Sequence, residues 1–303
     1  LFRERGWTYW HHLFNPRQLL LLGLISKKIN IGNFKQLRAN IFGIGRISEN
    51  NSRLCRWGSA RDESKNVFSN QALNTFFNYG TKGFILFENL LCLKLNFKEE
   101  IINSSIIIKP QDARLIHAKC EYWITDPPYA DAINYHELGD FFLAWYEKHI
   151  PELFPEWYAE SKAAMAVKGS GQDFRESMVE CFSNFTRNMP DNGAQVVMFT
   201  HQDSSVWADL ALILWASGLQ VTAAWTIQTE TEASGIKKGN YVQGTVIMVL
   251  RKQKSEQTAF SSDIQADVEC EVREQLKSMT ELDDREDPNF SDTDYQLAAY
   301  AAA

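Results

Sequence analysis

The stretch Glu121-Tyr-Trp-Ile-Thr-Asp-Pro-Pro-Tyr129 decides how the chain is organised. Residues 122–125 are typical of a buried strand, and they run directly into two prolines, which cannot donate hydrogen bonds to a neighbouring strand. The strand must therefore end at Asp126. In an open α/β sheet, ligands bind beyond the carboxyl ends of the strands. The sequence thus predicts a carboxylate, two exposed carbonyls and an aromatic ring at that edge.

This set of groups suits a planar amino group on a heteroaromatic base. Its two N–H groups would donate to the Asp126 carboxylate and to the Pro127 carbonyl, while Pro128 keeps the turn rigid and the Tyr129 ring stacks on the base. Both hydrogen bonds localise the nitrogen lone pair and aim it at an electrophile. A neutral aromatic amine need not lose a proton before it attacks, so the expected role of Asp126 is to orient and polarise. The structural alternative is a strand-ending turn with a capping Asp.

Residues 126–129 look like the catalytic tetrapeptide of the amino-methyltransferases, which transfer a methyl group from S-adenosylmethionine to adenine N6 or cytosine N4 in DNA. The longer stretch, residues 126–142, is similar to a family of large bacterial adenine-specific DNA methylases that carry the DUF1156 domain. Further segments resemble this family in the same order: Leu13-Phe-Asn-Pro-Arg-Gln-Leu-Leu20, Ser52-Arg-Leu-Cys-Arg-Trp57, Trp145, Pro151-Glu-Leu-Phe154, Phe199-Thr-His201 and Tyr295-Gln-Leu-Ala-Ala-Tyr300.

The resemblance implies an adenine-specific DNA methyltransferase with S-adenosylmethionine as cofactor and DNA as partner. Residues 126–129 would be its catalytic turn, and the target base would be flipped out of the duplex, because its amino group is inaccessible there. Asp131, Asn134 and Tyr135 match the family just past the turn and are candidates for lining the base pocket. The choice between adenine and cytosine stays open on the residues alone.

Two further residues are candidates for the same edge. Asp112 follows residues 106–109, which are predicted to form a short buried strand. In this class of fold an Asp at that position commonly binds the adenine amino group of the cofactor, whereas the alternative is a turn Asp. His201 follows a predicted strand at residues 195–199 and either contacts the substrate or has a structural role.

The order of predicted elements indicates the fold class. After residue 106 the patterns predict helices at residues 135–150, 172–188 and 206–217 and strands at residues 122–125, 195–199, 221–229 and 244–250. Residues 230–243 leave no room for a crossover helix, so the last strand should return antiparallel as a hairpin. The prediction is an α/β fold: a partial, Rossmann-like sheet of the S-adenosylmethionine-dependent methyltransferase type with a final antiparallel hairpin, plus a helical N-terminal region.

Three regions are expected along the chain. Residues 1–105 should be mainly helical and basic, with a possible role in target recognition; residues 106–252 should form the second half of the catalytic core. Residues 253–303 should form an acidic linker and the start of a C-terminal helix that docks. The family places its cofactor-binding glycine turn upstream of the Asn-Pro-Arg-Gln segment. The only candidate here, Phe42-Gly-Ile-Gly45, has helical flanks, so we expect a helix interior, a fragment without the glycine motif, and weak cofactor binding.

Charge and composition limit the partners. The net charge is −7 over 303 residues, but residues 1–60 carry 10 Lys and Arg against 2 Asp and Glu, and such a basic segment can contact phosphates. The five cysteines are scattered without a C-x-x-C pair, so no metal site is expected. No apolar run of about 18 residues is present, which predicts a cytoplasmic protein without a membrane partner.

Two other classes of function remain open. An enzyme that methylates an amino group of RNA guanine or a protein glutamine amide can use a closely similar turn, because the nitrogen to be methylated is also planar. A degenerate methyltransferase fold could instead serve as a nucleic-acid-binding module among additional subunits of a modification or defence complex. Loss of cofactor binding would reveal that second class.

Overall fold

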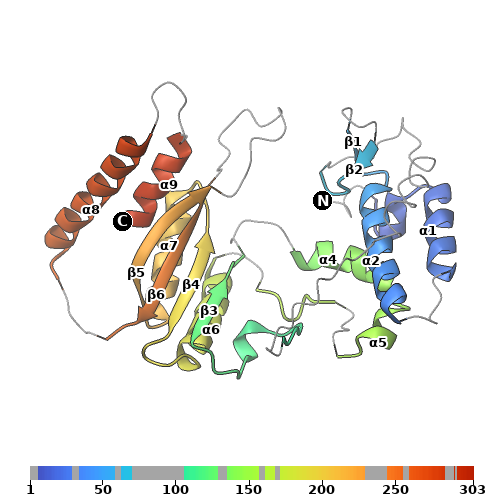
Figure 1. Ribbon diagram of the computed structural model, residues 1–303, viewed down its shortest axis with the longest axis horizontal. Helices are drawn as coiled ribbons and strands as arrows, with labels where there is room; N and C mark the ends of the chain where they lie inside the picture. The colour runs from blue at the N-terminus through green and yellow to red at the C-terminus, as the bar shows by residue number, and fades with distance from the viewer. Residues whose placement is uncertain are drawn as a thin grey trace. The chain divides into compact units, whose positions relative to one another are not determined.

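A computed structural model describes residues 6–28, 34–58, 63–69, 106–128, 135–156, 161–167, 171–228, 244–254, 259–283, 290 and 292–303. Within these ranges the chain is of the mixed α/β class, with eight α-helices and two sheets (Figure 1). It divides into two compact units, Leu1–Pro110 with Asn134–Ala164 and Gln111–Ile133 with Met165–Ala303. This division differs from the predicted regions, because residues 134–164 belong with the N-terminal part of the chain.

The first unit is helical with one small hairpin. Its elements are the 3-10 helix η2 (Trp10–Leu13), the α-helices α1 (Pro16–Lys28), α2 (Phe34–Asn50), α4 (Tyr135–Tyr146) and α5 (Ile150–Leu153), and the antiparallel strands β1 (Arg56–Gly58) and β2 (Glu63–Lys65). α1 begins at Pro16, directly after Asn15. The backbone N–H of Asn15 donates to Gln18 Oε1 at 2.8 Å, and that of Gln18 donates to Asn15 Oδ1 at 2.9 Å, a reciprocal capping box.

Phe141 of α4 is the centre of the first unit's core. Its side chain is fully buried, and its ring stacks on Phe14 with the centroids 5.7 Å apart and the planes at 9°. Trp10, Phe68 and Phe142 contact the same ring edge-on, with centroids 5.7, 5.2 and 5.0 Å away. These contacts explain why α4 folds with the N-terminal segment.

The second unit is a four-stranded sheet with helices. Its elements are η3 (Ala113–Leu115), β3 (Tyr122–Thr125), α6 (Gln172–Arg187), β4 (Ala194–Phe199), α7 (Ser204–Ala216), β5 (Leu219–Gln228), β6 (Gly244–Lys252), α8 (Ser261–Leu282) and α9 (Asp292–Ala302). The predicted strands and helices between residues 122 and 252 are confirmed within a few residues at each end. Gly218, at φ 77°, closes α7 as expected of a left-handed residue after a helix.

The strand order of this sheet is β3-β4-β6-β5. β3 runs parallel to β4, with Tyr122 opposite Ala194 and Thr125 opposite Val197. β6 is antiparallel to both of its neighbours, so the hairpin predicted for the last two strands is confirmed. The carboxyl ends of β3, β4 and β5 therefore lie at one edge of the sheet, together with the start of β6.

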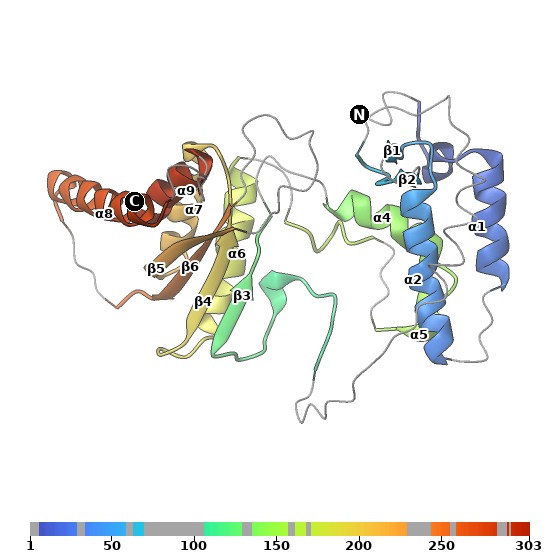
Figure 2. The same ribbon diagram turned by 45° about the horizontal axis from the view of Figure 1, so that its top comes forward.

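One face of this sheet is covered by helices. α6 and α7 lie behind the sheet in the view of Figure 1, and their side chains share one buried cluster with Trp123, Val197 and Val246 of the strands. α9 completes this cover, because Leu297 and Ala298 are each only 1% exposed and Leu297 joins the same cluster. The prediction that the C-terminal helix docks is confirmed. Figure 2 shows α9 beside α7 on the same side of the sheet.

Two expectations about the surroundings of the sheet were wrong. Ile106, Ile107 and Ile108 form no strand and are 70%, 74% and 63% exposed, because no neighbouring strand pairs with them among the described residues. Much of the expected acidic linker is the 22-residue helix α8. α8 packs on α9, and Met279 is the buried residue of α8. The linker prediction failed because the few apolar residues of this helix are spaced widely among charged ones.

Candidate functional site

The turn after β3 lies at the carboxyl edge of the second unit's sheet. β3 ends at Thr125, and Asp126 directly follows it with an exposed side chain, while Pro127 is buried and Pro128 is half-buried. The prediction that the prolines terminate this strand is confirmed. Tyr129 lies outside the described residues. The turn therefore exposes the Asp126 carboxylate to solvent, and the two prolines that follow keep the backbone of the turn rigid.

The strand beneath the turn is held by packing on one side and by backbone pairing on the other. Trp123 stacks on Phe185 of α6, with the ring centroids 4.6 Å apart and the planes at 19°. At the opposite end of the strand, the Ala194 N–H donates to the Glu121 carbonyl at 2.9 Å. These contacts fix the register of β3, so Asp126 has a defined position without help from any ligand.

His201 follows β4 at the same edge. Its Nδ1 accepts a hydrogen bond from the Asp203 N–H at 3.0 Å, which assigns the ring proton to Nε2, and its carbonyl accepts one from Trp207 Nε1 at 2.9 Å. Asp203 in turn caps α7 by accepting from the Ser205 N–H at 2.8 Å. Hydrogen bonds from the backbone and the side chain of Ser205 lower the pKa of Asp203. The imidazole is thus oriented by the start of α7.

Asp203 and Trp207 were not identified from the sequence. Asp directly before Ser204 is a strong helix-capping signal, and it would have moved the predicted start of this helix from residue 206 to residue 204. No local pattern reveals the indole hydrogen bond of Trp207, because it depends on the turn between β4 and α7.

Asp112 is engaged by its own neighbour. Its Oδ1 accepts from the Arg114 N–H and Nε at 2.9 Å each, and its Oδ2 accepts from Arg114 Nη2 at 2.7 Å. Hydrogen bonds from the Arg114 side chain are the main cause that lowers the pKa of Asp112. Asn184 of α6 anchors this turn by donating to the Ala113 and Ile116 carbonyls at 3.1 and 2.9 Å. A cofactor adenine at Asp112 would have to compete with the guanidinium.

The nearby thiol offers no nucleophile. Burial raises the pKa of Cys181 on α6 to about 11, with a smaller lowering influence from Arg114. The thiol is therefore protonated at neutral pH.

A buried carboxylate also reaches this edge from α9. Asp294 is 6% exposed, and a Cβ at Gly244 would come within 2.9 Å of its Oδ1 and 2.8 Å of Thr226 Cγ2. The Thr200 hydroxyl donates to the Gly244 carbonyl at 2.9 Å. Asp294 was missed because its position depends on the docking of α9 against β6, which no local signal specifies.

The remaining predicted residues are spread over the chain. Asp131 and Asn134 lie outside the described residues, and Tyr135 is the first residue of α4, 57% exposed, in the first unit. The segment Phe42-Gly-Ile-Gly45 lies inside α2, so the expected helix interior is confirmed. A Cβ at Gly45 would overlap the Tyr146 hydroxyl, so this glycine serves helix packing.

The described residues contain no group of three or more His, Cys, Asp or Glu side chains placed to hold a metal ion. Within the same ranges, every helix is too short or too polar to cross a membrane. Comparisons with protein-family models, with curated proteins and with solved structures each gave no match. A function for this chain therefore has to be argued from its own residues.

Proposed function

We propose that the chain binds and activates an exocyclic amino group of a flipped-out DNA base for methylation, with adenine N6 as the first candidate. One observation carries the proposal: an exposed Asp126 and two prolines follow a parallel strand at the carboxyl edge of the sheet. Ligands of open α/β sheets bind at this edge.

The turn provides the two acceptors that a planar amino group needs. The Asp126 carboxylate accepts one N–H and the Pro127 carbonyl accepts the other, so the nitrogen lone pair is directed out of the plane of the base. As the new N–C bond forms, the S–C bond of the sulfonium donor would break with its electron pair left on sulfur, and the positively charged nitrogen would then lose one proton to solvent. A carboxylate at 2.7 to 2.9 Å from that N–H, roughly the length of a charge-assisted hydrogen bond, stabilises the developing charge.

The sheet supports the same interpretation. Parallel strands β3 and β4, with α6 between them in the chain, followed by α7 and a hairpin of β5 and β6, form the arrangement expected for the second half of an S-adenosylmethionine-dependent methyltransferase sheet. β3 is the outer strand of the sheet as described, and Tyr122 and Ile124 on it are 66% and 70% exposed. A further strand could pair with the backbone of this outer edge, and an element on the face opposite α6 would cover these two side chains.

S-adenosylmethionine would supply the methyl group, but the described residues do not fit a site for it. Asp112 is held by Arg114, and Gly45 packs against Tyr146 within a helix bundle. A donor site needs a glycine turn that brings backbone N–H groups close to the ligand. A donor site in this proposal would therefore have to use residues outside the described ranges.

The test is methyl transfer by the protein with labelled S-adenosylmethionine and unmethylated DNA. Asp126→Ala should lower the rate of transfer at least about 100-fold, since it removes an acceptor that acts on the developing charge. Asp191→Ala is the matched control: Asp191 precedes β4 at the opposite edge, is 88% exposed and pairs with Lys252, so the rate should stay unchanged.

Nucleoside analysis of the product then identifies the target. N6-methyladenine supports the first candidate, and N4-methylcytosine keeps the chemistry while changing the base. Transfer to RNA or to protein glutamine, with DNA unmodified, replaces the DNA proposal by one of the rival substrates. Equal rates for wild type and Asp126→Ala would remove the turn from the mechanism.

A second candidate function has its own support, because the described residues do not form a donor site. If the protein binds no donor at all, it would act as a nucleic-acid-binding module without transfer. Calorimetric titration of the 303-residue chain with S-adenosylmethionine separates the two: we expect weak but measurable binding if the chain transfers a methyl group, and no binding if it is a module without transfer. Micromolar binding by the isolated chain would contradict our view of the donor site.

A further inference from the structure

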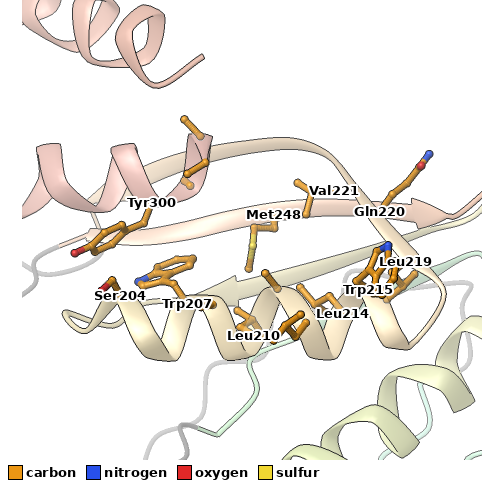
Figure 3. Close-up of a pocket in the computed structure, with 16 residues that line it drawn as sticks. Ser204, Trp207, Leu210, Leu214, Trp215, Leu219, Gln220, Val221, Met248 and Tyr300 are labelled. Atoms are coloured by element: carbon orange, nitrogen blue, oxygen red, sulfur yellow. The ribbon is translucent and has the colours of Figure 1, made fainter. Parts of the chain in front are cut away.

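The apolar groove of the second unit is part of the packing of its helices on the sheet. The groove has a volume of about 800 Å³ and lies between α7, β5, β6 and the end of α9 (Figure 3). Trp207, Leu210 and Leu214 point into it and belong to the buried cluster of this unit. None of the described residues that line it has a charged side chain. The exposed cations and aromatic rings of the first unit form a different kind of surface.

The N-terminal part of the first unit is strongly basic. Between residues 6 and 69, the side chains that the structure describes include one acidic residue, Glu49, against seven basic ones: Arg17, Lys27, Lys28, Arg46, Arg53, Arg56 and Lys65. Such an excess of positive charge attracts phosphate groups, and the attraction weakens as the salt concentration rises. A polyanion therefore fits the charge of this surface.

Two of these arginines, from segments far apart in the sequence, lie close to the 3-10 helix η2. The Arg53 N–H donates to the carbonyl of Leu13, the last residue of η2, at 2.7 Å. Arg17 lies in the first turn of α1, whose start is fixed by the reciprocal hydrogen bonds of Asn15 and Gln18. The Arg17 side chain is exposed and that of Arg53 is half-buried. Leu13 is thus in backbone contact with Arg53 and four residues from Arg17.

Two aromatic rings form an exposed stack at the other end of η2. The rings of Tyr9 and His11 stack with their centroids 5.5 Å apart and their planes at 14°. His12 packs edge-on against both rings, with centroids 5.5 and 4.5 Å away. The Tyr9 side chain is 66% exposed, and that of His11 is also exposed. One face of the Tyr9 ring therefore rests on His11, and a planar base can stack on the other face.

Cations beside a stacked pair of rings suit single-stranded nucleic acid, whose bases stack on aromatic side chains while its phosphates pair with arginine. In a duplex the neighbouring pairs cover the faces of each base, so only an unpaired base can reach the Tyr9 ring. We propose that Tyr9, His11, Arg17 and Arg53 form a binding surface for a single-stranded stretch of nucleic acid. One base stacks on the Tyr9 ring, and the two arginines pair with phosphates near that base. This surface is independent of the proposed methyl transfer, because it includes neither Asp126 nor a donor site.

The test is fluorescence anisotropy with the 303-residue chain and a labelled oligothymidylate, without S-adenosylmethionine. An oligonucleotide of about 12 nucleotides is long enough for such a surface and should bind about tenfold more tightly than the duplex of the same length. Tyr9→Ala should weaken binding of the single strand about tenfold, because it removes the stacking face. Tyr9→Phe keeps the ring and should bind as the wild type does.

The salt dependence tests the two arginines separately. Each phosphate contact to a single strand adds about 0.7 to the slope of the logarithm of the binding constant against the logarithm of the salt concentration. Arg17→Gln and Arg53→Gln should each reduce this slope by about 0.7, whereas Arg53→Lys keeps the charge and should keep the slope. Lys27→Gln is the matched control, because it removes a positive charge from the other end of α1, about 15 Å away along the helix axis, and should leave the slope unchanged.

Three results would overturn the proposal. The first is equal affinity for the single strand and the duplex, and the second is unchanged binding in Tyr9→Ala. The third is an equal reduction of the slope in Lys27→Gln and Arg17→Gln, since the charge would then act without a defined contact. Weaker binding in Tyr9→Ala together with a smaller slope only in the two arginine variants would support it, whether or not the protein transfers a methyl group.

Discussion

Gly45→Ala should destabilise the first unit, although alanine is normally the better helix residue. Gly45 lies in the middle of α2, and a Cβ there would overlap the Tyr146 hydroxyl and lie 2.9 Å from Tyr146 Cζ. The ring belongs to α4, which is anchored by the buried Phe141, so it cannot withdraw without disturbing this core. The variant therefore tests whether this glycine serves packing or a ligand.

The magnitude follows from two opposing effects. Replacing Gly by Ala within a helix contributes about 0.8 to 1 kcal/mol of stability. Overpacking a tight contact costs about 1 to 3 kcal/mol. Gly23→Ala is the matched control, because Gly23 is an exposed residue inside α1, and a methyl group added there would have no heavy atom within 4 Å beyond its own helix. The control has only the gain, so Gly45→Ala should be less stable than Gly23→Ala by about 1 to 3 kcal/mol.

Urea unfolding of both variants, followed by circular dichroism, measures this difference. A double-mutant cycle with Tyr146→Phe adds a second readout, since removal of the hydroxyl should return part of the loss. Equal or greater stability of Gly45→Ala relative to Gly23→Ala would refute the packing role. If Gly45→Ala abolished binding of S-adenosylmethionine and left the stability unchanged, Gly43 and Gly45 would belong to a cofactor-binding loop.

Two further predictions concern the core of each unit. Leu297→Ala should lower the free energy of unfolding of the second unit by about 2 to 5 kcal/mol, because the Leu297 side chain is 1% exposed. Leu212→Ala on α7 should change this free energy little, because the Leu212 side chain is 62% exposed. The urea midpoints of the two variants measure the difference. Burial raises the pKa of Tyr146 to about 12. The pKa of a tyrosine in an unfolded chain is about 10, so the neutral hydroxyl of Tyr146 favours the folded state. This contribution to the stability of the fold is fully present below about pH 10 and is lost as the pH rises toward the pKa of Tyr146 in the folded protein. Tyr146→Phe should remove that alkaline loss, and an unchanged alkaline midpoint would contradict it.

The elements that local patterns specify were predicted well. Two prolines end β3, Gly218 ends α7, and the alternation of β6 between buried and half-buried side chains marks a strand with one face on a core. The short, Gly-rich connection at residues 230–243 was sufficient to predict that β5 and β6 pair as a hairpin. Each of these features depends on residues that are close in sequence.

The failures depend on contacts between distant residues. Residues 106–109 have the composition of a buried strand, but Ile107 is 74% exposed, because no strand beside it is available among the described residues. The division into units was missed because Phe141 packs on Phe14, more than a hundred residues away, and no sequence period reports such a contact. Asp112 is a different case, because the partner of its carboxylate, Arg114, lies only two residues further along the chain.

The proposed reaction needs two binding events, that of the target amino group and that of the methyl donor, and these depend on different parts of the chain. Trp123 on Phe185 and the pairing of β3 with β4 hold Asp126 in place through contacts within the second unit, so binding of the target amino group should not depend on the donor segment. Donor binding, in the same proposal, would use residues outside the described ranges. If the proposal is right, Trp123→Ala should lower the rate of methyl transfer while the affinity for S-adenosylmethionine stays unchanged, and methyl-transfer assays together with calorimetry would measure the two effects separately.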